Sequence, residues 1–143
     1  PTSNINSVTD QISFTVVNSN NAMGVSNEAT VSIAISAVND APLNTVPGAQ
    51  TTAEDTSLSI TVISVTDVDG NLANTKLTVT NGTLSVDLTG GATISSGSNS
   101  SADLTLSGTQ TEINDALATL SYTPSANYNG SDTLTIISTD SYC

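Results

Sequence analysis

Two short acidic motifs stand out in a sequence that contains few charges. "AVNDAP" holds Asn39 and Asp40, and "TDVDGN" holds Asp67 and Asp69, two residues apart in a turn. Carboxylates at that spacing can point the same way, and Gly70 allows the backbone conformation that such a turn needs. Calcium binds about six to eight oxygen ligands, drawn from carboxylates, amide carbonyls, backbone carbonyls and water. No single loop here supplies that many, so a calcium site would have to be assembled from separated segments.

Each motif also has a purely structural interpretation. Asn-Asp before Ala-Pro favours a turn, and Asp-x-Asp-Gly favours a hairpin, with no metal involved. Taken alone, either motif fits a turn better than a metal site. If the carboxylates converge in space, however, they repel one another, and a cation is then needed to balance them.

The overall charge favours cations as binding partners and argues against two other classes. The 143 residues include thirteen Asp and Glu but one basic residue, Lys76, which gives a formal net charge of −12. Nucleic acids and anionic membranes are bound through clustered Lys or Arg, so we expect no nucleic-acid binding. The apolar runs are far shorter than a membrane span, so we also expect no membrane insertion. The composition is that of a mature extracellular segment.

The same composition argues against catalysis. The chain has no histidine, and its single cysteine is Cys143, so a disulfide within one chain and a zinc site of the His/Cys type are excluded. It also lacks arginine and a Gly-rich phosphate loop. Paired carboxylates can hydrolyse glycosides, but that would need a cleft with aromatic platforms, and aromatic residues make up only 3% of the sequence. We therefore predict that the protein is not an enzyme.

The elements that must position the acidic motifs are short β-strands. Alternating apolar residues bounded by turn-forming residues predict an all-β sandwich. The predicted strands are "QISFTVV" (11–17), "ATVSIAIS" (29–36), "SLSITV" (57–62), "KLTVTN" (76–81), "TLSVDL" (83–88), "SADLTLSG" (101–108) and "DTLTIIS" (132–138). One segment differs: Thr109 and Glu112 are spaced as a capping box, and Ile113, Leu117 and Leu120 follow at helical spacing. We expect one short helical segment near 111–119, before a strand that enters Tyr122.

A faint internal repeat suggests the domain organisation. "PSANYNGSDTLTIISTD" (124–140) matches "PTSNINSVTDQISFTVVN" (1–18) with one inserted residue in the earlier copy. In this match Asp10 aligns with Asp132, and the offset of 122 residues between them is typical of tandem modules. We therefore predict that residues 1–36 are the last strands of a preceding module, or donor strands for a neighbouring chain. Residues 37–42 would form the joint, and 43–143 a module that lacks its last strand.

The ordered set of motifs resembles the tandem cadherin-like repeats of large bacterial surface proteins and adhesins. The matching segments are "AVNDAP" (37–42), "AEDTSLSI" (53–60), "VTDVDGN" (65–71), "YTPSANYNGSDTLTI" (122–136) and "STD" (138–140). The resemblance implies a Greek-key sandwich of the Ig/cadherin-like type, with about seven strands, stiffened by Ca²⁺ at the joints between modules.

The resemblance also implies a set of metal ligands. Asp67 and Asp69 would meet Asn39 and Asp40 at the joint, and Asp140 would complete the cluster. Asn4 and Asn6 would approach from the first module, and Glu54 resembles the acidic residue that serves the joint at the module's other end. The set as a whole favours a metal over turns alone. Ala37 stands where such joints usually carry another acidic residue, so we expect only one or two ions.

Two functions follow from the resemblance. The first is a structural, calcium-stiffened repeat in a cell-surface adhesin or fibre, located outside the cell or at the bacterial surface, with neighbouring modules as its partners. The second is a self-assembling filament subunit that polymerises when identical chains donate β-strands to one another. The second rests on the register of the segment, in which 28–36 is a last strand and no such strand follows residue 140.

Overall fold

The computed structural model describes residues 9–14 and 29–141 of the chain. It divides into two compact units, Pro1–Asn39 and Asp40–Cys143, so that the boundary falls within the predicted joint 37–42. The first unit contains a two-stranded antiparallel hairpin of β1 (Thr9–Phe14) and β2 (Ala29–Ala34). The prediction that the units correspond to successive modules stays a prediction.

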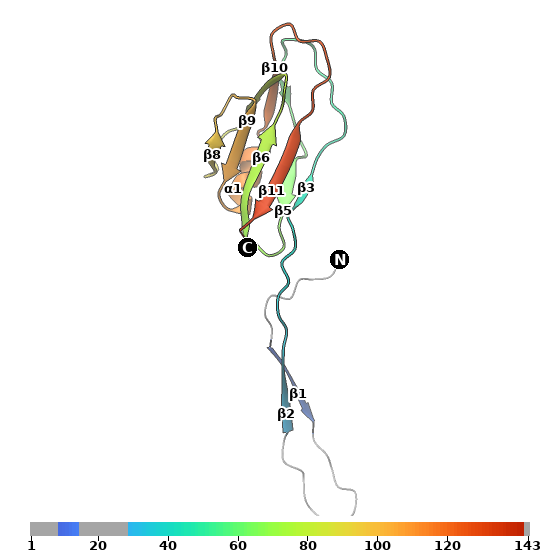
Figure 1. The fold of residues 1–143 in the computed structure, drawn as a ribbon, viewed down its shortest axis with the longest axis vertical. Coiled ribbons are helices and arrows are strands. Elements are labelled where there is room, and N and C mark those ends of the chain that lie inside the picture. Colours follow the sequence, from blue (N-terminus) through green and yellow to red (C-terminus); the bar gives the residue numbers. More distant parts are fainter. Residues whose placement is uncertain (1–8, 15–28, 142–143) are drawn as a thin grey trace, which may run out of the picture. The chain divides into compact units, whose positions relative to one another are not determined.

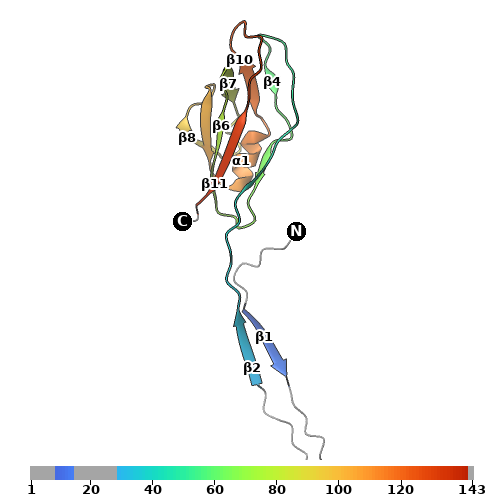
Figure 2. The same ribbon diagram turned by 45° about the vertical axis from the view of Figure 1, so that its right-hand side comes forward.

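The second unit is a β-sandwich with one short helix, which confirms the all-β prediction (Figures 1 and 2). One sheet has the order β11-β6-β9-β8, and a smaller one has the order β4-β10-β7, while β3 and β5 form a separate pair. The bounds are β3 Leu43–Thr45, β4 Leu58–Ser59, β5 Ser64–Thr66, β6 Leu72–Thr78, β7 Gly82–Ser85, β8 Thr93–Gly97, β9 Asp103–Ser107, α1 Gln110–Leu117, β10 Ser121–Pro124 and β11 Thr135–Asp140.

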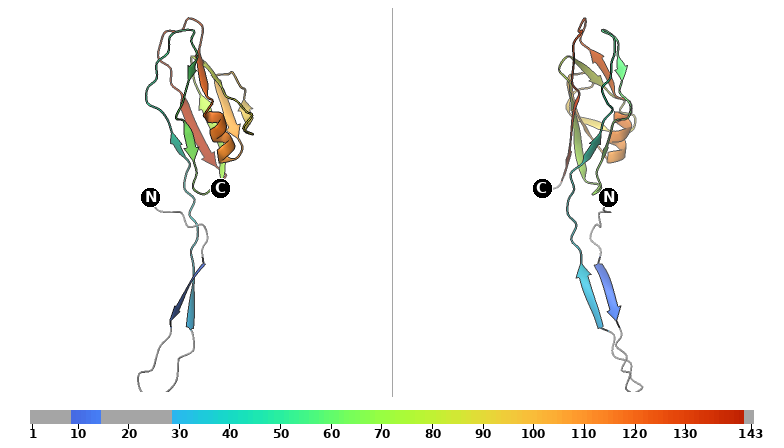
Figure 3. Two further views of the ribbon diagram at one scale, coloured as in Figure 1. Left: turned by 180° about the vertical axis from the view of Figure 1, so that it is seen from behind. Right: turned by 90° about the vertical axis from the view of Figure 1, so that its right-hand side faces the viewer.

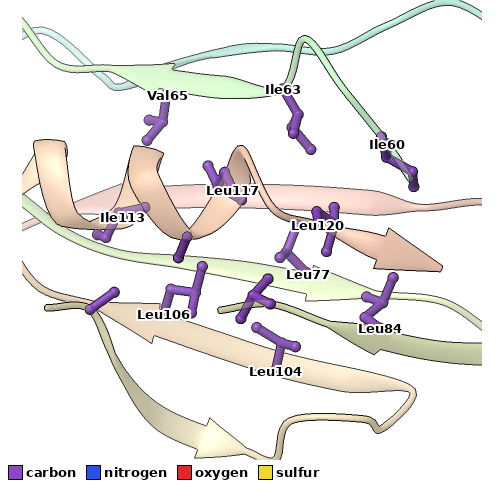
Figure 4. Close-up of a cluster of buried hydrophobic side chains, with 13 residues drawn as sticks. Ile60, Ile63, Val65, Leu77, Leu84, Leu104, Leu106, Ile113, Leu117 and Leu120 are labelled. Carbon is purple, nitrogen blue, oxygen red and sulfur yellow. The ribbon is translucent and has the colours of Figure 1, made fainter. Parts of the chain in front are cut away.

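The core lies between the four-stranded sheet and a second layer that includes α1. Figure 3 shows α1 on the side of the sandwich away from β11. Apolar side chains from both layers meet in the interior, as the close-up of Figure 4 shows. The fully buried members include Val65 on β5, Leu77 on β6, Leu104 and Leu106 on β9, and Ile113 and Leu117 on α1. Each such side chain contributes about 1.5–3 kcal/mol by leaving water, so this core fixes the positions of the loops at both ends.

The predicted helix is confirmed. The α1 helix spans Gln110–Leu117, and Thr109 is its N-cap. The Thr109 side chain accepts a hydrogen bond from the Glu112 backbone, and the Glu112 carboxylate accepts one from the Thr109 backbone at 2.7 Å. This pair of bonds is the capping box that the sequence indicates.

The predicted strand 57–62 differs from the structure, which breaks it after two residues. Leu58–Ser59 forms β4, and Val62 has φ of 61°, in the left-handed region that β-branched residues rarely adopt. The turn changes the direction of the chain so that Ile60 and Ile63, three residues apart, are both buried. The core therefore overrides the alternation of the local sequence at this point, and β5 follows as a separate strand.

Candidate functional site

The loop after β5 buries one of the predicted metal ligands. Asp67 follows the buried Val65, and its side chain is only 6% exposed. The Asp67 backbone amide donates to Oε1 of Gln110 at 2.7 Å, so the first residue of α1 holds the loop in place. We expected Asp67 to lie in a turn rather than in the core; it does follow β5 in a loop, but it is buried, because α1 packs over the start of that loop.

The two carboxylates of this loop act as acceptors for backbone amides. Oδ1 of Asp67 accepts from the Asp69 amide at 2.9 Å, which closes the turn. Oδ2 of Asp69 accepts from the Asp40 amide at 2.7 Å, which fastens the segment before β3 to the loop. Gly70 has φ of +70°, and a Cβ there would meet nothing within 4 Å, so the backbone conformation rather than space is what favours glycine.

The fourth predicted carboxylate of the sandwich lies at the same end. Asp140 is the last residue of β11 and pairs with Leu72 across a register shift. The next residue, Ser141, donates through its amide and its hydroxyl to the Asn71 carbonyl, at 2.9 and 3.0 Å. Figure 1 shows the end of β11, the β5–β6 loop and the start of β3 at one end of the sandwich. We call Asp40, Asp67, Asp69 and Asp140 the acidic end.

Of the remaining predicted ligands, Glu54 lies away from the acidic end. Glu54 lies in the loop between β3 and β4 and lines a pocket with residues 128–134 of the β10–β11 loop. Both loops reach the opposite end of the sandwich in Figure 1. Asn39 belongs to the first compact unit, whereas Asp40 begins the second. Asn4 and Asn6 lie outside the described residues.

The donor chemistry of the acidic end suits a hard cation, although its carboxylates are held by amides. In the described ranges, no three His, Cys, Asp or Glu side chains are grouped closely enough to hold a metal ion. However, Oδ2 of Asp67 is buried and has no hydrogen-bond partner. A buried oxygen of a carboxylate that lacks a partner costs about 1–3 kcal/mol or more. An ion coordinated by oxygen would satisfy this atom, so the residues present fit Ca²⁺ in chemistry.

A second polar network, which the sequence analysis missed, fixes the opposite end. Asp132 accepts from the backbone amides of Thr80, Asn81 and Thr133 at 3.1, 2.8 and 2.8 Å. The hydroxyl of Tyr122 lies 2.9 Å from Oδ2 of Asp132 and donates toward it. The aspartate thus joins the β10–β11 loop to the β6–β7 turn. The signal for it in the sequence is its place in the internal repeat, where Asp132 aligns with Asp10.

The pKa values of this network reflect its hydrogen bonds. Burial raises the pKa of Asp132, but the backbone amides and the Tyr122 hydroxyl lower it more, so it ends below its ordinary value. Burial, and then the hydrogen bond and charge of Asp132, raise the pKa of Tyr122 to about 12. Asp132 is therefore ionised and Tyr122 protonated at neutral pH, which is the combination that the hydrogen bond between them requires.

Comparison with known proteins identifies one family. The family model described as the protein GAMETE EXPRESSED 2 domain matches residues 49–142, well over half of the chain. Comparisons with curated proteins and with solved structures gave no match. Within the part of the chain that the structure describes, no helix is long and apolar enough to cross a membrane.

This match corrects the interpretation drawn from the sequence motifs. The assignment to bacterial cadherin-like repeats is wrong, because the matched model is that of a gamete-expressed protein. The two functions derived from it, a calcium-stiffened spacer in an adhesin and a strand-donating filament subunit, are wrong for the same reason, as is the bacterial cell surface. The error has a physical origin, because the residues of "VTDVDGN" are also those that favour a turn. Asp67 and Asp69 accept backbone amides here, and aspartates do the same in turns of unrelated proteins.

Proposed function

We propose that this chain, which belongs to the family of the protein GAMETE EXPRESSED 2 domain, is a non-catalytic module that binds calcium at the acidic end of its sandwich. The proposal takes from the family only the setting, a gamete-expressed protein. The binding chemistry comes from the residues of the chain. The absence of histidine and arginine from the sequence supports a binding role over a catalytic one.

One observation carries the proposal, namely the buried Oδ2 of Asp67. This oxygen has no hydrogen-bond partner, although the side chain is 94% buried. The chain offers one basic side chain, Lys76, which lies on β6 with its backbone paired to β9 and β11. A bound cation is the simplest group that would compensate a buried carboxylate oxygen in a protein of net charge −12.

Binding would draw on Oδ2 of Asp67 and on other oxygens of the acidic end. Among the described residues, no three acidic side chains are grouped there closely enough to hold the ion by themselves, so backbone carbonyls and water would supply the remaining ligands. Because Oδ2 of Asp69 accepts the Asp40 amide at 2.7 Å, that hydrogen bond would compete with the ion. The proposal therefore predicts that calcium changes the hydrogen exchange of the Asp40 amide.

Thermal unfolding in calcium and in chelator tests the proposal. A ligand that binds only the folded state adds about 2.7 kcal/mol to the free energy of unfolding at a hundredfold excess over Kd. We expect calcium to raise the Tm of the wild type, and Asp67→Asn to abolish this increase. The asparagine keeps an oxygen that can accept the Asp69 amide, so the variant should stay folded in chelator.

Two controls distinguish calcium binding at a specific site from general screening of the negative charges by salt. Asp103→Asn removes one charge from an exposed position at the start of β9 and should keep the full calcium response. Potassium chloride at matched ionic strength should reproduce little of the increase, because screening is not selective for calcium. Identical melting curves in calcium and chelator, or an unchanged calcium response in Asp67→Asn, would refute the proposal.

A further inference from the structure

An open groove lies at the end of the sandwich opposite the acidic end. It has a volume of about 900 Å³ and lies between two walls, residues 46–54 of the β3–β4 loop and residues 128–134 of the β10–β11 loop. Its floor is apolar and is formed by side chains that pack on the core: Leu58, Ile60, Val79, Tyr122 and Leu134. We call this the strand groove. It exposes to solvent a flank of the core that a sandwich normally covers.

A sheet edge begins directly after the second wall of the strand groove. The β11 strand is the edge of its sheet and pairs with β6 alone. Its other neighbour, β3, pairs with β5 and meets β11 through a side-chain bond, from the Ser138 hydroxyl to Oδ1 of Asn44 at 2.6 Å. Residues 46–52 lie outside every strand, and most of them are exposed. An apolar floor beside unpaired backbone is the arrangement to which an extended peptide adds as a strand.

Hydrogen bonds fix the two walls of the groove relative to each other and to the sandwich. Oδ1 of Asp55, which follows the first wall, accepts the amide of Asn127, which precedes the second, at 2.9 Å. The Tyr128 hydroxyl donates to the Ser131 carbonyl at 2.7 Å, and Asp132 fastens the second wall to the β6–β7 turn. The binding surface therefore exists before any peptide arrives, which lowers the entropic cost of binding.

We infer that the strand groove binds an extended peptide with alternating apolar side chains and basic flanking residues, added as a strand beside the start of β11. Alternate side chains of a strand point to one face, so every second residue would cover the apolar floor. The basic flanks are inferred from charge: Glu54 and Asp132 line the groove, and the protein carries a net charge of −12. Complementary charge also speeds the encounter of such a peptide with its site.

The test uses the 143-residue chain and the synthetic peptide acetyl-Lys-Val-Thr-Val-Thr-Val-Lys-amide. We expect saturable binding and slower hydrogen exchange of those amides in residues 134–137 that do not already bond to β6, where the new ladder would form. A peptide of the same composition, acetyl-Lys-Val-Val-Thr-Thr-Val-Lys-amide, breaks the alternation and should bind at least tenfold more weakly. Equal binding of the two peptides would overturn the inference, since charge alone would then explain it.

Two variants complete the experiment. Ala49→Trp places a large ring on an exposed wall residue and should weaken binding at least tenfold, whereas Ser96→Trp adds the same ring on β8, at the far edge of the sheet, and should leave binding unchanged. Unchanged binding by Ala49→Trp would overturn the inference. So would sedimentation as a dimer in which the amides of residues 134–137 that do not bond to β6 are already protected, because a second copy would then occupy the groove.

Discussion

Removal of the Asp132 carboxylate should destabilise the sandwich more than removal of an ordinary surface charge. The side chain accepts three backbone amides and receives the Tyr122 hydroxyl, and so links segments that are about fifty residues apart in the chain. Asp132→Ala leaves the three amides without this acceptor, and the Tyr122 hydroxyl keeps only the neutral Asn81 carbonyl, at 3.1 Å. The amide of Asn81 and the hydroxyl of Tyr122 are partly buried, so water replaces the carboxylate poorly there.

The expected loss is worked out from these four bonds. The two partly buried bonds contribute about 1–2 kcal/mol each, because hydrogen bonds to a charged acceptor are stronger than neutral ones. The amides of Thr80 and Thr133 are exposed, so water compensates most of their loss. Asp132→Ala should therefore lower the free energy of unfolding by about 2–4 kcal/mol. Asp132→Asn should lower the free energy of unfolding by at least half as much. Its NH₂ group is a donor and would face the Asn81 amide and the Tyr122 hydroxyl, which now donate to Oδ2.

Urea denaturation at pH 7, with Asp103→Ala as an exposed control, measures the change. The pKa of Asp132 is lowered in the folded state, so its contribution to stability is complete above about pH 5 and is lost as the pH falls through the lowered pKa. The difference between wild type and Asp132→Ala should accordingly shrink below about pH 4. A difference smaller than about 0.5 kcal/mol at pH 7 would refute the reasoning, because such values are ordinary for surface positions.

Three further predictions concern the sandwich. Thr109→Ala should cost about 1 kcal/mol in urea denaturation through loss of the N-cap, and Thr109→Ser should recover most of it. Gly82→Ala should cost about 1–3 kcal/mol or prevent folding, because its Cβ would overlap the Tyr122 ring and the Thr123 carbonyl; a fully stable variant would contradict this packing. In absorbance titrations, Tyr122 should ionise near pH 12 and at lower pH in Asp132→Ala, whereas an unchanged titration would show that Asp132 does not act on the ring.

The parts of the fold that depend on neighbouring residues were predictable from the sequence. Thr109 and Glu112 are three residues apart, and that spacing alone is enough to predict the start of α1. Most strands show alternation that the core preserves, so the fold class followed as well. The break at Val62 was not predictable, because it is imposed by the burial of Ile60 and Ile63 in the same core.

The sequence singled out aspartates of the candidate site, but it did not predict their burial or their hydrogen-bond partners. The family resemblance implied that Asp40, Asp67 and Asp69 would meet as metal ligands; hydrogen bonds to backbone amides connect them, and their role as ligands stays a prediction. The burial of Asp67 depends on Gln110, more than forty residues away, so no local pattern reports it. The role of Asp132 is likewise set by amides about fifty residues distant. Local motifs therefore identify the carboxylates but not the groups that hold them.

Six carboxylates of the sandwich accept backbone amides, which helps to explain how a unit with eleven acidic residues and one basic residue can fold. Hydrogen bonds of this kind are formed by Asp55, Asp67, Asp69, Asp87, Glu112 and Asp132. Those from Thr89 and Thr109 lower the pKa values of Asp87 and Glu112, which shows that the amides favour the charged form. Oδ2 of Asp67 differs from the oxygens that accept these amides, because it is buried and has no hydrogen-bond partner. The acidic end is therefore the place in the sandwich where a cation would add a contact that the backbone does not supply.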